Sequence, residues 1–124
     1  MPIVSIEIAI AEHEVELPHN KVKEIANHLG VLFESEKGGT WVKVTYLPWK
    51  QYAENSANFH ESAKPAIVEI LKKTLPDPDE MAAEAKQVAK IVGAVISRPE
   101  ENIHIIFLPE SLGRVAFGGN LIRS

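Results

Sequence analysis

Pro2 is the residue whose type and position best suit a catalytic role. If Met1 is removed, Pro2 carries a secondary amine on a rigid ring at the start of the chain. An α-amine titrates near ~8 in model peptides, and an apolar pocket or a neighbouring cation lowers this pKa because each disfavours the charged form. Such an amine could move a proton between a carbon and a carbonyl oxygen in a keto–enol isomerisation. The simpler interpretation is that Pro2 only begins a strand, and a retained Met1 would make its nitrogen a non-basic amide.

Other kinds of catalytic or binding site have little support in the sequence. The absence of cysteine excludes disulfides, thiolate metal sites and cysteine nucleophiles. The serines lack a GxSxG context, and the glycines of GRVAFGG are not followed by a helix, so they do not form a phosphate loop. No HxxxH or HExxH pair occurs among the histidines, which are His13, His19, His28, His60 and His104. We therefore expect no metal site.

Composition limits the class of protein and its partners. A chain of 124 residues, 45% of them hydrophobic, is long enough for one domain with a real core, and we assign residues 1–124 to it. The formal net charge of -4, without a basic cluster, argues against nucleic acid as a partner. No apolar run reaches the roughly 18 residues of a membrane span, and the first residues do not resemble a signal peptide. These features predict a cytoplasmic protein with no membrane partner.

The first half of the chain reads as strand, helix and strand. Residues 2–10 (PIVSIEIAI) are rich in β-branched side chains and predict a strand. After Leu17-Pro18, apolar residues recur every three or four positions, as on one face of a helix: Val22, Ile25, Ala26, Leu29, Leu32 and Phe33. We expect Gly38-Gly39 to end this helix. Residues 40–47 (TWVKVTYL) then predict a second strand, which Pro48 ends.

The second half follows the same plan. A strand is predicted over residues 66–73 (AIVEILKK). Asp77 suits the cap of a second helix, with Pro78 at its first position and Glu80 three residues after the cap. Arg98-Pro99 should end this helix, and residues 103–108 (IHIIFL) predict a fourth strand.

The chain therefore looks like a duplicated β–α–β unit, with repeats at approximately 2–48 and 65–119. Two such units predict an α/β fold with a four-stranded sheet and both helices on one face. The fourth strand is apolar on both sides, with Ile103, Ile105 and Phe107 on one and Ile106 and Leu108 on the other. Because two helices cover only one sheet face, we expect other copies of the chain to cover the second.

A strand that begins at Pro2, the duplicated unit and the closing GRVAFGG hairpin together resemble the tautomerase superfamily. The longer members, such as the macrophage migration inhibitory factor group, carry two β–α–β units per chain, and three chains make a barrel. The resemblance implies a cofactor-free isomerase of this trimeric type. Its substrate would be a small α-keto or enol carboxylate, with Pro2 as the general base after loss of Met1. Two alternatives remain: a hydratase or dehalogenase of unsaturated acids using the same proline as an acid, or a non-catalytic oligomeric interaction protein that keeps the fold.

The resemblance also implies cations that bind the substrate carboxylate. Lys37 lies where the inhibitory factor group carries a pocket lysine, although it could equally be a solvated loop residue. His104 occupies the place of a substrate-binding residue in the fourth strand, and Lys43 the matching place in the second. A single histidine on an apolar strand is more often a hydrogen-bonded structural residue.

Three further cations are candidates. Lys72 and Lys73 end the third strand near the arginines of haloacrylate dehalogenases, and of the two we select Lys73 as a ligand. Because these residues are lysines, the paired-arginine clamp is missing, which disfavours dehalogenation. Arg114 in the closing hairpin could serve a neighbouring subunit. Phe107 and Phe117 could form apolar walls.

Overall fold

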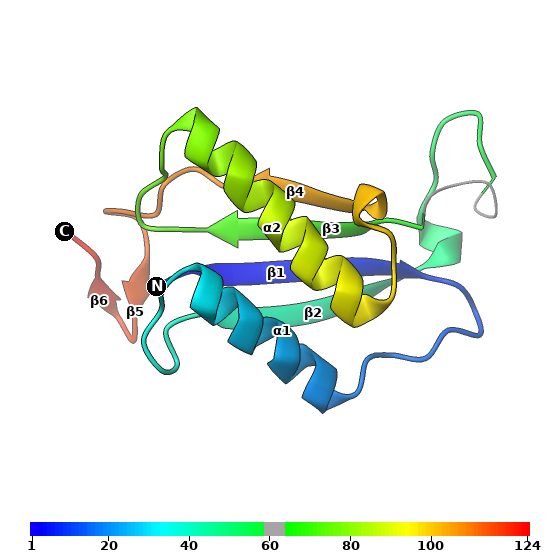
Figure 1. Ribbon diagram of the computed structural model, residues 1–124, viewed down its shortest axis with the longest axis horizontal. Coiled ribbons are helices and arrows are strands. Elements are labelled where there is room, and N and C mark those ends of the chain that lie inside the picture. The colour runs from blue at the N-terminus through cyan, green and yellow to red at the C-terminus, as the bar shows by residue number, and fades with distance from the viewer. Residues whose placement is uncertain (59–63) are drawn as a thin grey trace.

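A computed structural model describes residues 1–58 and 64–124, and its main feature is a four-stranded sheet with two helices on one face (Figure 1). The strands are β1 (Ile3–Ile10), β2 (Trp41–Pro48), β3 (Ala66–Leu71) and β4 (Ile103–Phe107), in the order β2-β1-β3-β4. The helices are α1 (His19–Leu32) and α2 (Pro78–Ile96). The predicted α/β fold with both helices on one face is confirmed.

Each half of the chain forms a β–α–β unit with parallel strands. Strand β2 pairs in parallel with β1, and β4 pairs in parallel with β3. The two halves join through an antiparallel pairing of β1 with β3. Consequently the start of β1 lies beside the end of β3, at the end of the sheet where α1 also finishes and α2 begins (Figure 1).

The core lies between the sheet and the helices because alternate strand residues point to the helical side. Strand β1 contributes Val4, Ile6 and Ile8, and β3 contributes Ala66, Val68 and Ile70, all buried. From the helices come the buried residues Ile25, Leu29, Val88, Val92 and Val95. Ile25 and Leu29 belong to the apolar stripe that the sequence predicts for the first helix.

The start of α2 follows its predicted capping pattern. Asp77 is the cap, Pro78 is the first helical residue, and the Glu80 N–H donates to Asp77 Oδ1 at 2.9 Å. This hydrogen bond satisfies one of the amide groups that lack a partner in the first turn.

The predicted end of the first helix at Gly38-Gly39 is wrong, because α1 ends at Leu32. Glu34 takes a left-handed conformation (φ 53°) just beyond the helix. Its N–H donates to the Val31 carbonyl at 3.1 Å, and the Ser35 N–H donates to the Gly30 carbonyl at 2.8 Å. This is the Schellman arrangement, which normally places glycine where Glu34 stands. The non-glycine residue concealed the helix end in the sequence.

Other predicted boundaries move by one or two residues. The strand predicted over 66–73 ends at Leu71, so that Lys72 and Lys73 lie beyond it. Strands β1 and β2 each begin one residue later than predicted, and β4 ends one residue earlier. Two short 3₁₀ helices, η1 (Trp49–Gln51) and η2 (Glu100–Asn102), follow β2 and α2.

The closing hairpin forms as GRVAFGG predicts. Strands β5 (Ala116–Phe117) and β6 (Asn120–Leu121) are joined by Gly118 and Gly119. Both glycines have positive φ, 58° and 86°, as a two-residue turn of this kind requires. The hairpin lies beside the start of β1 (Figure 1). Neither helix of the described ranges is long and apolar enough to cross a membrane.

Candidate active site at the amino-terminal end of β1

Pro2 lies at the end of the sheet where β1 begins. Its carbonyl accepts a hydrogen bond of 3.0 Å from the Trp41 N–H, which fixes it against β2. On the other side, Ile3 pairs with Leu71, so continuing this antiparallel register by one place sets Pro2 opposite Lys72. Pro2 is half-buried. Its position two residues before Val4 directs it toward the helical side of the sheet.

A hollow of about 320 Å³ opens beside Pro2. Its wall is the segment that follows α1, with Phe33, Glu34, Ser35, Glu36 and Gly39 as lining residues together with Met1 and Pro2. The Schellman end of α1 turns this segment back across the start of β1. The Ser35 and Thr40 hydroxyls are hydrogen-bonded at 2.5 Å and hold its two ends together. A side chain at Gly39 would come within 3.0 Å of the Glu36 carbonyl oxygen, so this turn needs glycine.

Lys72 is the cation that the sheet register brings level with Pro2. Its Nζ lies 2.8 Å from Glu84 Oε1 on α2 and 5.0 Å from the centre of the Phe33 ring. The side chains are only 18% and 14% exposed, so this ion pair is largely withdrawn from water. Glu84 Oε2 is buried and has no hydrogen-bond partner within the described residues. The Lys72 charge is therefore nearly balanced by Glu84.

The closing hairpin packs against the same end of the sheet through an aromatic pair. The rings of Trp41 and Phe117 meet edge to face, with centroids 5.2 Å apart and planes at 85°. Trp41 pairs with Ile3 in the parallel register, and its Nε1–H donates to the Gly38 carbonyl at 3.0 Å. Phe117 thus contacts Trp41, whose N–H donates to the Pro2 carbonyl. Phe107 packs against the core instead.

Comparison with known proteins identifies the fold. No protein-family model matches the sequence, and no curated protein sequence matches it. A fused 4-OT described as a symmetric trimer is 9% identical, with 97% of this chain and 94% of that chain covered and a TM-score of 0.75. Pt0534 inactivated by 2-oxo-3-pentynoate is 11% identical, with 97% and 95% covered and a TM-score of 0.72. Macrophage migration inhibitory factor from Oncomelania hupensis is 16% identical, with 99% and 83% covered and a TM-score of 0.72.

This chain has the tautomerase fold. The likeness in fold extends over almost the whole chain. At these identities the likeness concerns the fold, and the roles of individual residues stay predictions.

Lys37, one of the predicted ligands, is exposed and lies in the turn before β2. It lines a separate hollow of about 410 Å³ that shares Glu34, Ser35 and Glu36 with the hollow at Pro2. Lys37 is therefore adjacent to the candidate site without lining it in a single chain.

His104 and Lys43 are exposed on the sheet face that the helices leave open. His104 pairs with Ile67, four residues before the Leu71 that meets Ile3, which separates it from the start of β1 by about 13 Å along the strands. Lys43 pairs with Ser5. Within one chain of the tautomerase fold, neither side chain reaches the hollow at Pro2.

Lys73 and Arg114 lie near the same end of the sheet. The Lys73 carbonyl accepts the Leu112 N–H at 3.3 Å, and within the described residues its side chain has no ion-pair partner. The Arg114 guanidinium donates to the Pro109 carbonyl at 2.9 Å and through Nε to the Glu110 carbonyl at 3.0 Å. Arg114 thus stabilises the loop of residues 109–114 to which it belongs.

Three acidic residues at the candidate site escaped sequence reasoning. Glu34 and Glu36 line the hollow beside Pro2, and Glu84 binds Lys72. An ion pair between Lys72 and an acidic residue in the first turns of α2 was predictable from the sequence, because the end of a strand and the start of the next helix are close in this fold.

His60 and Ser62 lie outside the described residues. In the described ranges, no three histidine, aspartate or glutamate side chains gather as metal ligands would.

Proposed function

We propose that this chain, once Met1 is removed, is a cofactor-free isomerase that interconverts the keto and enol forms of a small carboxylate. The observation that carries the proposal is the position of Pro2, half-buried at the edge of a hollow of about 320 Å³ at the start of β1. Likeness in fold to fused 4-OT supports it. Pt0534, another protein of this fold, is inactivated by 2-oxo-3-pentynoate, which is itself a small 2-oxo acid.

In this mechanism the Pro2 nitrogen is the base that takes a proton from the carbon next to the carbonyl. The ring fixes the direction of the lone pair, so little orientational entropy is lost on the way to the transition state. The Phe33 ring supplies an apolar wall of the hollow. The protonated nitrogen then returns the proton to the other end of the enol system.

Lys72 is the cation that best fits the substrate carboxylate or the developing enolate, because it stands opposite Pro2 in the extended register. A substrate anion would compete with Glu84 for its ammonium group. Lys37, Lys73 and Arg114 remain secondary candidates around the hollow, since each belongs to a segment near this end of the sheet.

We further propose that three chains assemble around their open sheet faces. Fused 4-OT of the same fold is described as a symmetric trimer. The open face carries Ile106, which is 48% exposed, and the hairpin carries the exposed Leu112 and Leu121. In such an assembly His104 and Lys43 would face neighbouring copies and could serve their sites.

A second candidate function, addition of water to an unsaturated acid or its dehalogenation, is favoured by one specific observation. Glu34 and Glu36 line the hollow and would stabilise the protonated form of the Pro2 amine. A protonated proline acts as an acid, as these reactions require. The direction in which the rate changes with pH separates the two functions, because only a base gains activity as the amine loses its proton.

Labelling with 2-oxo-3-pentynoate tests the site. An amine adds to the triple bond of such a ketone, so the processed protein should gain the mass of one reagent molecule on its amino-terminal peptide. The Met1-bearing protein is the matched control and should not be labelled on Pro2, whose nitrogen is an amide in that form. Labelling of lysines alone, at equal rates in both forms, would remove Pro2 as the reactive group.

A further inference from the structure

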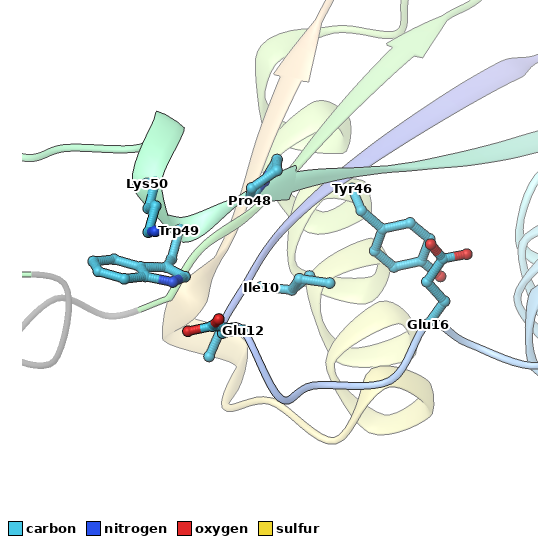
Figure 2. Close-up of a pocket in the computed structure, with 8 residues that line it drawn as sticks. Ile10, Glu12, Glu16, Tyr46, Pro48, Trp49 and Lys50 are labelled. Atoms are coloured by element: carbon cyan, nitrogen blue, oxygen red, sulfur yellow. The ribbon is translucent and has the colours of Figure 1, made fainter.

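A second hollow, of about 400 Å³, lies at the opposite end of the sheet from Pro2 (Figure 2). Its apolar and aromatic lining comes from Ile10, Tyr46, Pro48 and Trp49. Strand β1 runs eight residues from Ile3 to Ile10, so about 23 Å of strand separates this hollow from the candidate active site. A ligand bound here would not touch the residues around Pro2.

The strand arrangement brings these side chains together. Because β1 and β2 are parallel, both strands end at this edge, where Ile10 pairs with Pro48. Pro48 ends β2 and is followed directly by the 3₁₀ helix η1, which carries Trp49. The Tyr46 hydroxyl accepts a hydrogen bond of 2.8 Å from the Leu17 N–H, which fixes both the ring and the end of the loop after β1. The Tyr46 wall is thus held by a backbone contact.

The loop that follows β1 adds negative charge to this hollow. Glu12 and Glu16 both line it, and Figure 2 shows Ile10 between them, with Trp49 toward one side and Tyr46 toward the other. Neither carboxylate has an ion-pair partner within residues 1–58 and 64–124. Two carboxylates beside one lysine, Lys50, leave the hollow with a net negative charge.

Lys50 already shows that this aromatic surface accepts a cation. Its Nζ lies 5.8 Å from the centre of the Trp49 ring, within the range of a cation–π contact. Lys50 is exposed and its stem is flexible, so a ligand ammonium that also meets Glu12 could replace it. Anions are disfavoured here by both carboxylates, and a purely apolar ligand would leave them unused.

We propose that this hollow binds a small organic ammonium ion with an apolar or aromatic body. The ammonium would lie between the Trp49 ring and the Glu12 carboxylate, and Glu16 would add negative charge on the Tyr46 side of the hollow. The apolar body would rest on Ile10 and Pro48, against Tyr46. This site is separate from the proposed isomerase chemistry and stands whether or not Pro2 is catalytic.

Nuclear magnetic resonance of the two indole N–H groups tests the proposal with an internal control. Phenethylammonium is the probe, and phenylacetate is the anion of similar size. Phenethylammonium should shift the Trp49 indole signal in a saturable way and leave that of Trp41, at the other end of the sheet, unchanged. Phenylacetate should shift neither. Equal effects of the two probes on Trp49, a shift of Trp41 alone, or no shift at millimolar probe would overturn the proposal.

Matched variants locate the charge that recognises the probe. Glu12→Gln keeps the side-chain shape and should weaken phenethylammonium binding about three- to ten-fold because an ammonium partner is lost. Glu16→Gln, on the Tyr46 side, should weaken it less because only a more distant negative charge is removed. Lys50→Met should strengthen binding about three-fold because it removes a competing cation. Glu80→Gln, a carboxylate removed at the start of α2, is the control and should change nothing. Unchanged binding in both the Glu12 and Glu16 variants would contradict the assignment.

Discussion

Lys72 and Glu84 form an ion pair of 2.8 Å between the end of β3 and the first half of α2, over the ring of Phe33. Lys72 stands opposite Pro2 when the β1–β3 register is continued by one place, and the pair is largely buried. The Lys72–Glu84 pair therefore affects both the stability of this end of the fold and the positive charge available to bind an anionic substrate.

Removing either partner of this pair should have opposite effects on an anionic substrate. Lys72→Met should raise KM because a cation is lost. Glu84→Gln should lower KM about three-fold or more, because the substrate no longer competes with a carboxylate for Lys72. Steady-state kinetics with a 2-oxo acid measures both, and Lys86→Met, at an exposed lysine on α2, is the matched lysine control. An unchanged KM in both variants would exclude Lys72 as a ligand.

The same pair predicts an asymmetry in stability. Lys72→Met leaves the buried Glu84 carboxylate without its cation and should cost about 1–3 kcal/mol in the free energy of unfolding. Adding Glu84→Gln removes the unpaired charge, so the double variant should recover part of that loss. Urea denaturation of the three variants measures this. A double variant less stable than Lys72→Met alone would contradict the explanation.

Glu34 and Glu36 predict the pH dependence of the isomerase reaction. Their carboxylates favour the charged amine, so replacing both by glutamine should lower the pKa of the Pro2 amine. The pH profile of kcat/KM should then move to lower pH by roughly half a unit, since both residues are exposed and screened. The exposed Glu101→Gln serves as the control. A shift toward higher pH would mean that these carboxylates do not act on the reacting nitrogen.

The open sheet face predicts how assembly can be disrupted. Ile106→Asp should convert a trimer into monomers, because an aspartate buried at the interface would have no partner. The fold of the single chain should be kept, because Ile106 is already 48% exposed there. Val15→Asp, at a loop residue that is 90% exposed, is the matched control and should remain trimeric. Sedimentation equilibrium distinguishes three chains from one. A wild-type protein that is monomeric at micromolar concentration would refute the barrel.

Glu14 predicts a loss of stability in acid. Partial burial alone would raise its pKa, but the Ala11 N–H at 2.7 Å, the Arg98 guanidinium at 3.0 Å and Lys64 outweigh burial and hold the pKa below its ordinary value. Its contribution is therefore present above the pKa of the unfolded chain and is lost as the pH falls through the lowered value. Glu14→Gln should lower Tm at pH 7 and converge with the wild type near pH 3. Glu100→Gln is the control, and a constant Tm difference across this range would contradict the linkage.

The fold could be predicted because its signals are local and occur twice. Strand patterns of period two, helical stripes, the Asp77 cap and the paired glycines of the hairpin each specify one element. The end of α1 could not be predicted, since Glu34 occupies the left-handed position that glycine usually marks. The central antiparallel pairing of β1 with β3 has no signal within either half.

The candidate site was only partly predictable, because part of it is formed by long-range contacts that have no local signal in the sequence. Pro2 is conspicuous by its position, and the sequence places both Lys72 and Lys73 at the end of the third strand. Lys72 faces Glu84 because it continues the side of β3 that carries the buried Ile70, but β3 has apolar residues on both sides, so the sequence does not show which side the helices cover. Similarly, Glu34 and Glu36 join Pro2 only because the chain turns back after α1.

Turnover of an enol carboxylate by the processed and the Met1-bearing forms of the same protein decides whether Pro2 is the catalytic base. The processed form should ketonise the enol of phenylpyruvate, and the Met1-bearing form should not, because its proline nitrogen is an amide. Pro2→Ala, which keeps a primary amine after processing, should retain a small part of the activity. Equal rates for the processed and Met1-bearing proteins would contradict the proline mechanism.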